Sequence, residues 1–217
     1  MTTPIAEHDT IRFDAQGFDL SRVTVGLSWR VTHTRQNFFK RLLSGSGEGF
    51  DLDAAAILLD AQDKVRDFGD VRDLGAGRKV GLIDSDVIFY NNLQHPSGTV
   101  WHTGDDLKAG SSKDHEQIIL DLTALPEDYV KVLFSLCIHQ GQSRGQHFAL
   151  VRQIALDLRD AGGRRIGQFQ WMDTQAYAQQ CTLVVAALHR LPGAWELRQV
   201  REGYASDSFV EVLKSHV

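Results

Sequence analysis

The sequence predicts an all-β protein folded as a two-sheet β-sandwich. Three observations carry this prediction. Short runs rich in β-branched, aromatic and other apolar residues recur along the chain. Turn signals such as Pro96-Ser-Gly98, Ala161-Gly-Gly163 and Pro192-Gly193 separate several of these runs. Helical periodicity is scarce, so alternating βα units are not expected.

Each predicted strand follows from its own local pattern. Val23–Trp29 alternates at first and then becomes apolar, as a half-buried strand does. Asp51–Leu59 begins with polar residues and continues as an apolar run. The remaining predicted strands, in chain order, are Val87–Tyr90, Thr99–His102, Gln117–Leu122, Val130–His139, Gln153–Leu158, Cys181–Leu188 and Trp195–Val200.

One or two short helices complete the prediction. Gln146–Arg152 is one candidate, and Asp207–Ser215 is a C-terminal one with Ser206 as its N-cap. We expect the terminal helix to dock on the domain or on a neighbouring subunit of a homo-oligomer. The chain therefore divides into an N-terminal segment (1–20), a sandwich domain (21–205) and a helical tail (206–217). Within the domain, residues 32–49 and 64–84 resemble long loop insertions.

Composition restricts the class of protein. The chain has 217 residues, of which 42% are hydrophobic and 24% charged, which is typical of a soluble globular domain. The formal net charge of −5 argues against nonspecific binding to nucleic acid. Cys137 and Cys181 lie in apolar runs and are expected to be reduced core thiols. Without a signal pattern or a long apolar stretch, we expect a cytoplasmic protein with no transmembrane segment.

Acids and amides collect at the ends of the predicted strands. Asp51 and Asp53 are two residues apart, which places both on one face of a strand. Asn91-Asn92, Asp105-Asp106 and Asp114-His-Glu116 flank other strands. If these ends meet at one rim, the oxygen ligands suit Ca²⁺, while Mg²⁺ would need fewer of them and zinc would prefer a His/Cys cluster. The alternative is that the residues simply form turns.

An ordered series of motifs resembles the TerD-type tellurite-resistance and stress-response proteins. The resemblance covers Ser21 to Ala205 and continues through Gly141-Gln-Ser143 and Ala194-Trp195. Its five motifs are Gly26-Leu-Ser-Trp29, Phe50-Asp-Leu-Asp-Ala54, Phe89-Tyr-Asn-Asn92, His102-Thr-Gly-Asp-Asp106 and Asp114-His-Glu-Gln117.

The resemblance implies a sandwich with C2-like character that binds calcium between acidic loops at one end. It implies a non-enzymatic role in a bacterial chemical-stress response, with other stress-response proteins or a membrane-associated complex as partners. Asn91 is left out of the implied ligands because adjacent strand residues point to opposite faces. The calcium ligands that it implies are Asp51, Asp53, Asn92, Asp105, Asp106, Asp114 and Glu116.

One loop departs from the family pattern. The stretch before Glu116 reads Ala109-Gly-Ser-Ser-Lys-Asp-His-Glu116, so Lys113 brings a positive charge and His115 replaces a carboxylate. Fewer anionic ligands weaken calcium binding. We therefore expect one good calcium site, with the second weakened or lost.

Four alternatives remain open. Gly141-Gln-Ser-Arg-Gly145 matches the nucleophile elbow of serine hydrolases, with Ser143 followed by Asp157 or Asp173 and then His189. The acidic cluster is compatible with a metal-dependent hydrolase. A C2-like sandwich is compatible with a membrane-binding module. A zinc site built from Cys137, His139 and His147 competes with their role as ordinary core or rim residues.

Overall fold

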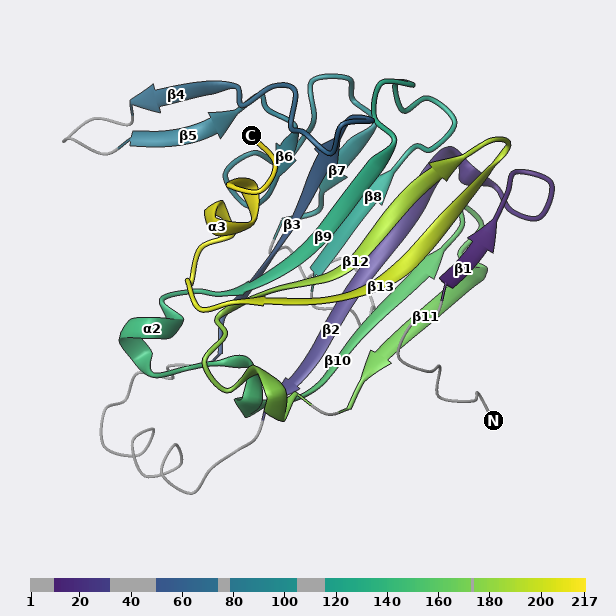
Figure 1. Ribbon diagram of the computed structural model, residues 1–217. Helices are drawn as coiled ribbons and strands as arrows, with labels where there is room; N and C mark the ends of the chain where they lie inside the picture. Colours follow the sequence, from purple (N-terminus) through teal and green to yellow (C-terminus); the bar gives the residue numbers. More distant parts are fainter. Residues whose placement is uncertain (1–9, 32–49, 74–78, 105–115, 173) are drawn as a thin grey trace.

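The protein is a sandwich of two antiparallel sheets, which confirms the predicted fold class (Figure 1). The computed structural model describes residues 10–31, 50–73, 79–104, 116–172 and 174–217. The first sheet contains, in spatial order, β1 (Thr10–Phe13), β13 (Ala194–Tyr204), β12 (Thr182–Leu191), β9 (Lys131–Ile138), β3 (Leu52–Leu59) and β6 (Val87–Ile88). The second contains β11 (Arg165–Trp171), β10 (Val151–Arg159), β2 (Val23–Val31), β8 (Glu116–Leu120) and β7 (Val100–His102).

The core between the sheets is built from alternating side chains. In β3, Ala54, Ala56 and Leu58 belong to the cluster between the sheets. Their neighbours Ala55, Ile57 and Leu59 belong to a second cluster on the outer face of the first sheet. Because both faces of β3 are buried, this strand reads as an almost continuous apolar run rather than as a simple alternation.

The C-terminal segment covers that outer face. The short helix α3 (Val210–Leu213) places Val212 and Leu213 in the outer cluster, where both are buried. Beyond α3, the backbone N–H of Val65 donates to the carbonyl of His216 over 2.9 Å. The predicted terminal helix thus exists, but it is confined to four residues and is preceded by Phe209 rather than capped by Ser206.

The predicted helix over 146–152 is wrong. The chain instead forms α2 (Gly141–Arg144) and the 3₁₀ turn η2 (Phe148–Leu150), and β10 already begins at Val151. The reason is tertiary, because Phe148 is fully buried and Val151 pairs with Val31 of β2. Another 3₁₀ turn, η1 (Leu20–Arg22), leads into β2, and a third, η3 (Gln175–Tyr177), precedes β12.

Several strands lie where none was predicted. β11 pairs with β10, and β1 pairs with β13, so the first sheet extends to Thr10, ahead of the domain boundary placed at residue 21. The 64–84 stretch contains a two-stranded ribbon, β4 (Asp70–Asp73) and β5 (Lys79–Ile83), which projects from the sandwich in Figure 1. The other predicted insertion, 32–49, lies outside the described residues.

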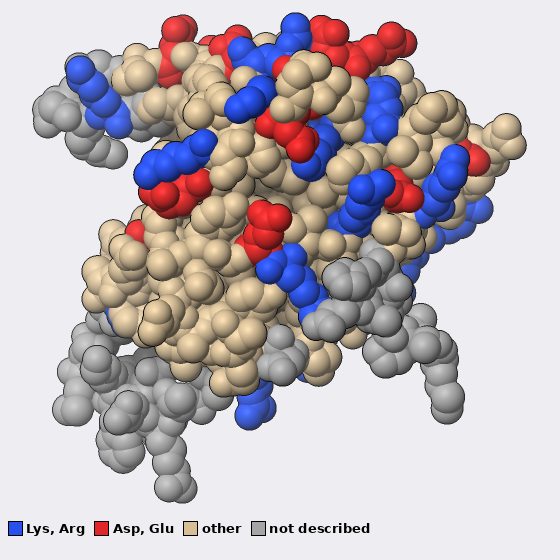
Figure 2. All heavy atoms as spheres, in the orientation of Figure 1, with Lys and Arg blue, Asp and Glu red and all other residues tan. Residues whose placement is uncertain are grey.

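Opposite charges are interspersed on the face shown in Figure 2. Ion pairs join Lys131 to Asp63 over 2.9 Å and Lys214 to Glu211 over 2.7 Å. Exposed pairs of this kind contribute at most about 1 kcal/mol each. In the described part of the chain, no helix is long and apolar enough to cross a membrane.

Candidate functional site

The predicted carboxylate ligands that the structure describes begin two strands at the same end of the sandwich. In Figure 1, β2 runs toward the lower end and β12 toward the upper end. β8 is antiparallel to β2, β9 to β12, and β3 to β9, so β3 and β8 both run upward from the lower end. Asp51 and Asp53 lie where β3 begins, and Glu116 is the first residue of β8.

Glu116 is a buried carboxylate that faces a buried imidazole. His102 pairs with Ile118 across β7 and β8, which puts it diagonally opposite Glu116 on one face. Glu116 Oε2 lies 3.0 Å from His102 Nε2, but the two atoms are not aligned for a hydrogen bond. The His102 Nδ1 accepts a 2.9 Å hydrogen bond from the Gly104 N–H, so the proton of a neutral ring lies on Nε2.

Glu116 Oε2 is therefore a buried acceptor that lies at ion-pair distance from His102 Nε2 but makes no aligned hydrogen bond. Leaving a buried carboxylate oxygen without a hydrogen-bond donor costs free energy. A bound cation would stabilise the negative charge of such an oxygen, and carboxylate oxygens are the ligands that calcium prefers. In this respect Glu116 fits the predicted metal site.

Asp53 has a different environment. It lies opposite Cys137 in the β3–β9 pairing, and its Oδ2 is 3.7 Å from Nδ1 of His139. The backbone N–H of His139 donates to the carbonyl of Asp51 over 2.8 Å, which fixes this histidine beside both acids. Burial, followed by the nearby negative charge of Asp53, raises the pKa of Tyr90.

Asp53 and Glu116 face different sides of their sheets. Asp53 alternates with Ala54 and so shares the outer face with Ala55. Glu116 alternates with Gln117 and shares the inner face with Ile118. Among the described residues, no three His, Cys, Asp or Glu side chains are close enough to hold a metal ion.

Asn92 is occupied within its own turn. Its Oδ1 accepts from the N–H of Asp84 over 3.2 Å, and its Nδ2 donates to the carbonyl of Val87 over 2.8 Å. Its other hydrogen bonds go to Ser85. The structure therefore gives Asn92 a role in holding this turn, while its role as a metal ligand stays a prediction. The three remaining predicted ligands, Asp105, Asp106 and Asp114, lie outside the described residues.

The sequence did not point to a second buried carboxylate, Asp86. Asp86 is 1% exposed and accepts hydrogen bonds from the Tyr129 hydroxyl (2.6 Å) and from the N–H groups of Arg66 (2.9 Å) and Asp67 (2.8 Å). His95 Nε2 lies 3.1 Å from its Oδ1. Burial alone would raise the pKa of Asp86, but these hydrogen bonds outweigh burial and hold the pKa below its usual value.

The structure does not assemble the serine-hydrolase alternative at Ser143. The Ser143 hydroxyl donates to the carbonyl of Gln140 over 3.0 Å. Asp157 is held by Arg159 and by Arg165 on the second sheet. His189 belongs to β12 of the first sheet, and burial lowers its pKa. Asp173 lies outside the described residues.

The zinc alternative gains no support from the cysteines. Cys137 and Cys181 are buried free thiols. Burial raises the pKa of Cys137 to about 11, which disfavours the thiolate that zinc requires. Cys137 Sγ instead accepts a hydrogen bond from the Thr182 hydroxyl over 3.2 Å.

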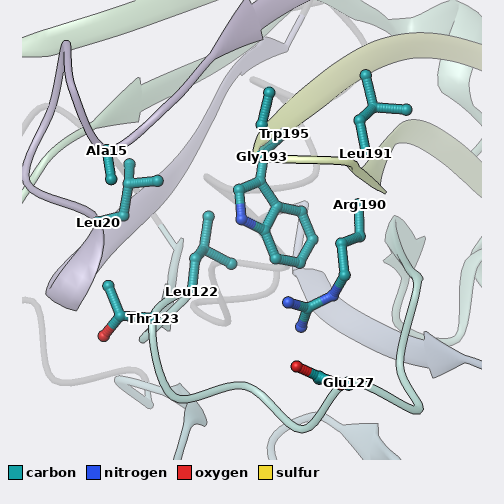
Figure 3. Close-up of a pocket in the computed structure, with 10 residues that line it drawn as sticks. Ala15, Leu20, Leu122, Thr123, Glu127, Arg190, Leu191, Gly193 and Trp195 are labelled. Carbon is teal, nitrogen blue, oxygen red and sulfur yellow. The ribbon is translucent and has the colours of Figure 1, made fainter.

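A hollow of about 610 Å³ lies beside the β12–β13 turn, where Arg190 and Trp195 meet (Figure 3). The Arg190 guanidinium lies over the Trp195 ring at 4.4 Å and donates to the carbonyls of Leu125 (2.9 Å) and Tyr129 (3.1 Å). Burial lowers the pKa of Arg190, while the charge of Glu127 raises it. Arg190 thus serves to hold the loop before β9 against the sandwich.

Comparison with known proteins identifies the class of this sandwich. The model of the TerD domain matches residues 1–72 and 73–216. Tellurium resistance protein TerX of Serratia marcescens is 33% identical over the full length of both chains. Stress response protein SCP2 of Bacillus subtilis is 27% identical, with 91% of this chain and 90% of that protein covered.

A solved structure has the same fold. It is a homologue of the telluride resistance protein TerD from Streptomyces coelicolor, with a TM-score of 0.54 and 20% identity. The match covers 88% of this chain and 94% of that one. The chain belongs to the TerD family, whose named members here include tellurium resistance and stress response proteins.

Proposed function

We propose that this protein is a non-enzymatic, calcium-binding scaffold or adaptor of a bacterial chemical-stress response, acting in the cytoplasm. The observation that carries the calcium proposal is the buried Glu116 oxygen, which makes no hydrogen bond. The names of the relatives TerX and SCP2 support the stress-response part.

Calcium would be held by the carboxylates at the lower end of the sandwich. Glu116 supplies a buried oxygen ligand on the inner face, and Asp51 and Asp53 supply oxygen ligands at the start of β3. The predicted donors Asp105, Asp106, Asp114 and Asn92 complete the set. Since Asp53 and Glu116 face different sides of their sheets, these donors serve either two sites or one site that spans the end of the sandwich.

A bound cation would neutralise these acids and order the loops that carry them. A surface for another stress-response protein, or for a membrane-associated complex, would then form only in the calcium-bound state. This coupling would make the protein a calcium-dependent adaptor.

Thermal unfolding of chelator-stripped protein tests the proposal. A ligand that binds only the folded state, present at a concentration of about 100 times its Kd, stabilises that state by roughly 2.7 kcal/mol. This raises the Tm of a domain of this size by roughly 5–10 °C. We expect this rise with calcium and a smaller one with magnesium. Equal melting with and without calcium would exclude a working site.

A further inference from the structure

A chain of hydrogen bonds links Asp86, His95 and Ser97 outside the proposed metal site. His95 Nε2 lies 3.1 Å from Asp86 Oδ1, and His95 Nδ1 lies 2.7 Å from Ser97 Oγ. Asp86 and His95 are buried, at 1% and 4% exposure, whereas Ser97 is exposed. A buried acid, a buried imidazole and the hydroxyl of an exposed serine thus follow one another in that order.

The surrounding contacts fix the direction of these hydrogen bonds. The backbone N–H of Ser97 donates to His95 Nδ1 over 3.1 Å, so Nδ1 carries no proton in the neutral ring. The ring proton is then on Nε2 and is donated to Asp86. The Ser97 hydroxyl lies closer to the same unprotonated Nδ1 and donates its own proton to it, so the hydroxyl and the Ser97 N–H share the single lone pair of this nitrogen.

The neighbours of Ser97 and Asp86 favour transfer of that proton. Thr99 Oγ1 lies 2.6 Å from Ser97 Oγ, and the Thr99 N–H donates to the same oxygen over 3.3 Å. Because the Ser97 proton is already directed to His95, the Thr99 hydroxyl donates to Ser97 Oγ and stabilises negative charge on it. Asp86, kept ionised by Tyr129 and two backbone N–H groups, stabilises the imidazolium that forms.

A hollow of about 310 Å³ lies beside the turn that carries Ser97. It is lined by Gly98, the residue after Ser97, and by Leu93, Gln94, Trp101 and His102. Leu93 and Trp101 make part of its wall apolar. A short apolar acyl group would contact the Leu93 and Trp101 part of this wall, while Gln94 and His102 make the rest polar.

We propose that Ser97 is an activated serine that is acylated by activated esters of short apolar acids, with His95 as the general base. Ser97 Oγ forms a bond to the carbonyl carbon while its proton moves to His95 Nδ1. The bond from that carbon to the leaving alcohol breaks, and His95 returns the proton to the departing oxygen. The products are one O-acyl-serine and one alcohol, so the step is a stoichiometric modification and does not depend on calcium binding.

Two probes test the proposal on the full chain at neutral pH. A fluorophosphonate probe should label wild-type protein, and peptide mapping should place the label on Ser97. 4-Nitrophenyl acetate should release a burst of one nitrophenolate per chain. Both signals should disappear in Ser97→Ala and slow by roughly 100-fold in His95→Gln, the scale of general-base assistance.

Ser143→Ala is the matched control, because Ser143 is also exposed but donates to a backbone carbonyl. It should label as the wild type does. Thermal melting of each variant checks that it is folded, since Ser97→Ala also removes the hydrogen bonds of Ser97 Oγ to His95 and Thr99. Absence of label on folded wild-type protein, a label mapped to another residue, or equal labelling of Ser97→Ala would overturn the proposal.

Discussion

Asp86 is a single buried side chain that holds three separate segments of this protein together. Its two oxygens accept four hydrogen bonds that join the segment before β4, the turn after β6 and the loop before β9. The pattern is invisible in sequence, because Tyr129 lies 43 positions from Asp86 and no local spacing connects them. The sequence pointed to Asp53 and Glu116 because each has a second acid two positions before it in the chain, Asp51 and Asp114.

We expect Asp86→Asn to lower the free energy of unfolding by about 3 kcal/mol, since it replaces a charged acceptor with an amide whose N–H₂ meets other donors. Urea unfolding at pH 7 measures this change. Asp70→Asn, on the exposed ribbon strand β4, is the control and should change it by less than about 0.5 kcal/mol. An unchanged unfolding midpoint in Asp86→Asn would contradict the role assigned to this carboxylate.

Asp86 also makes the stability of the folded state depend on pH. Because the folded pKa of Asp86 is lower than its ordinary value, its ionised form stabilises the folded state above about pH 4, the unfolded pKa. That contribution is lost as the pH falls through the folded pKa. Wild-type stability should therefore drop more steeply below pH 4 than that of Asp86→Asn.

Among the elements, the C-terminal helix α3 matters more than its four residues suggest. Leu213 and Val212 close the outer cluster over β3 and β9, and the segment beyond them is hydrogen-bonded to Asp63 and Val65. The apolar positions of this segment allowed it to be predicted as a docking helix, although its length was overestimated.

Leu213→Ala should cost about 3 kcal/mol, because it removes a buried side chain and leaves a cavity under the segment. Val210→Ala, at a position that is 45% exposed on the same helix, should change stability by less than about 0.5 kcal/mol. Denaturant unfolding of both variants measures the difference. Equal stability of the two variants would mean that α3 does not hold the outer face.

Which strands could be predicted depends on how they are buried. β9 and β12 form long apolar runs that the sequence displays directly. β11 does not, since Phe169 and Trp171 are its only buried residues and its interior Gly167 lies against Ile11 of β1. A Cβ at Gly167 would come within 2.3 Å of the Ile11 side chain, so the two strands can approach this closely only with glycine at this position. The apolar pattern of β11 is therefore interrupted.

At the scale of the whole molecule, the order of motifs predicted the family and the sandwich, because family motifs are local in sequence. It did not predict which acids share a face, since that depends on strand register across two sheets. The register separates Asp53 from Glu116, and it places His102 against Glu116. The central claim of a calcium-binding end thus rests on the carboxylates of two strands.

Titration calorimetry of the chelator-stripped protein with calcium tests this claim most directly, with magnesium as the competing ion. We expect saturable calcium binding in the wild type and in the surface control Asp70→Asn. Glu116→Gln removes the negative charge but keeps the shape of the side chain, so it should abolish the tightest binding, and Asp53→Asn should weaken binding. No heat of calcium binding in the wild type, or the same affinity in Glu116→Gln, would contradict the account.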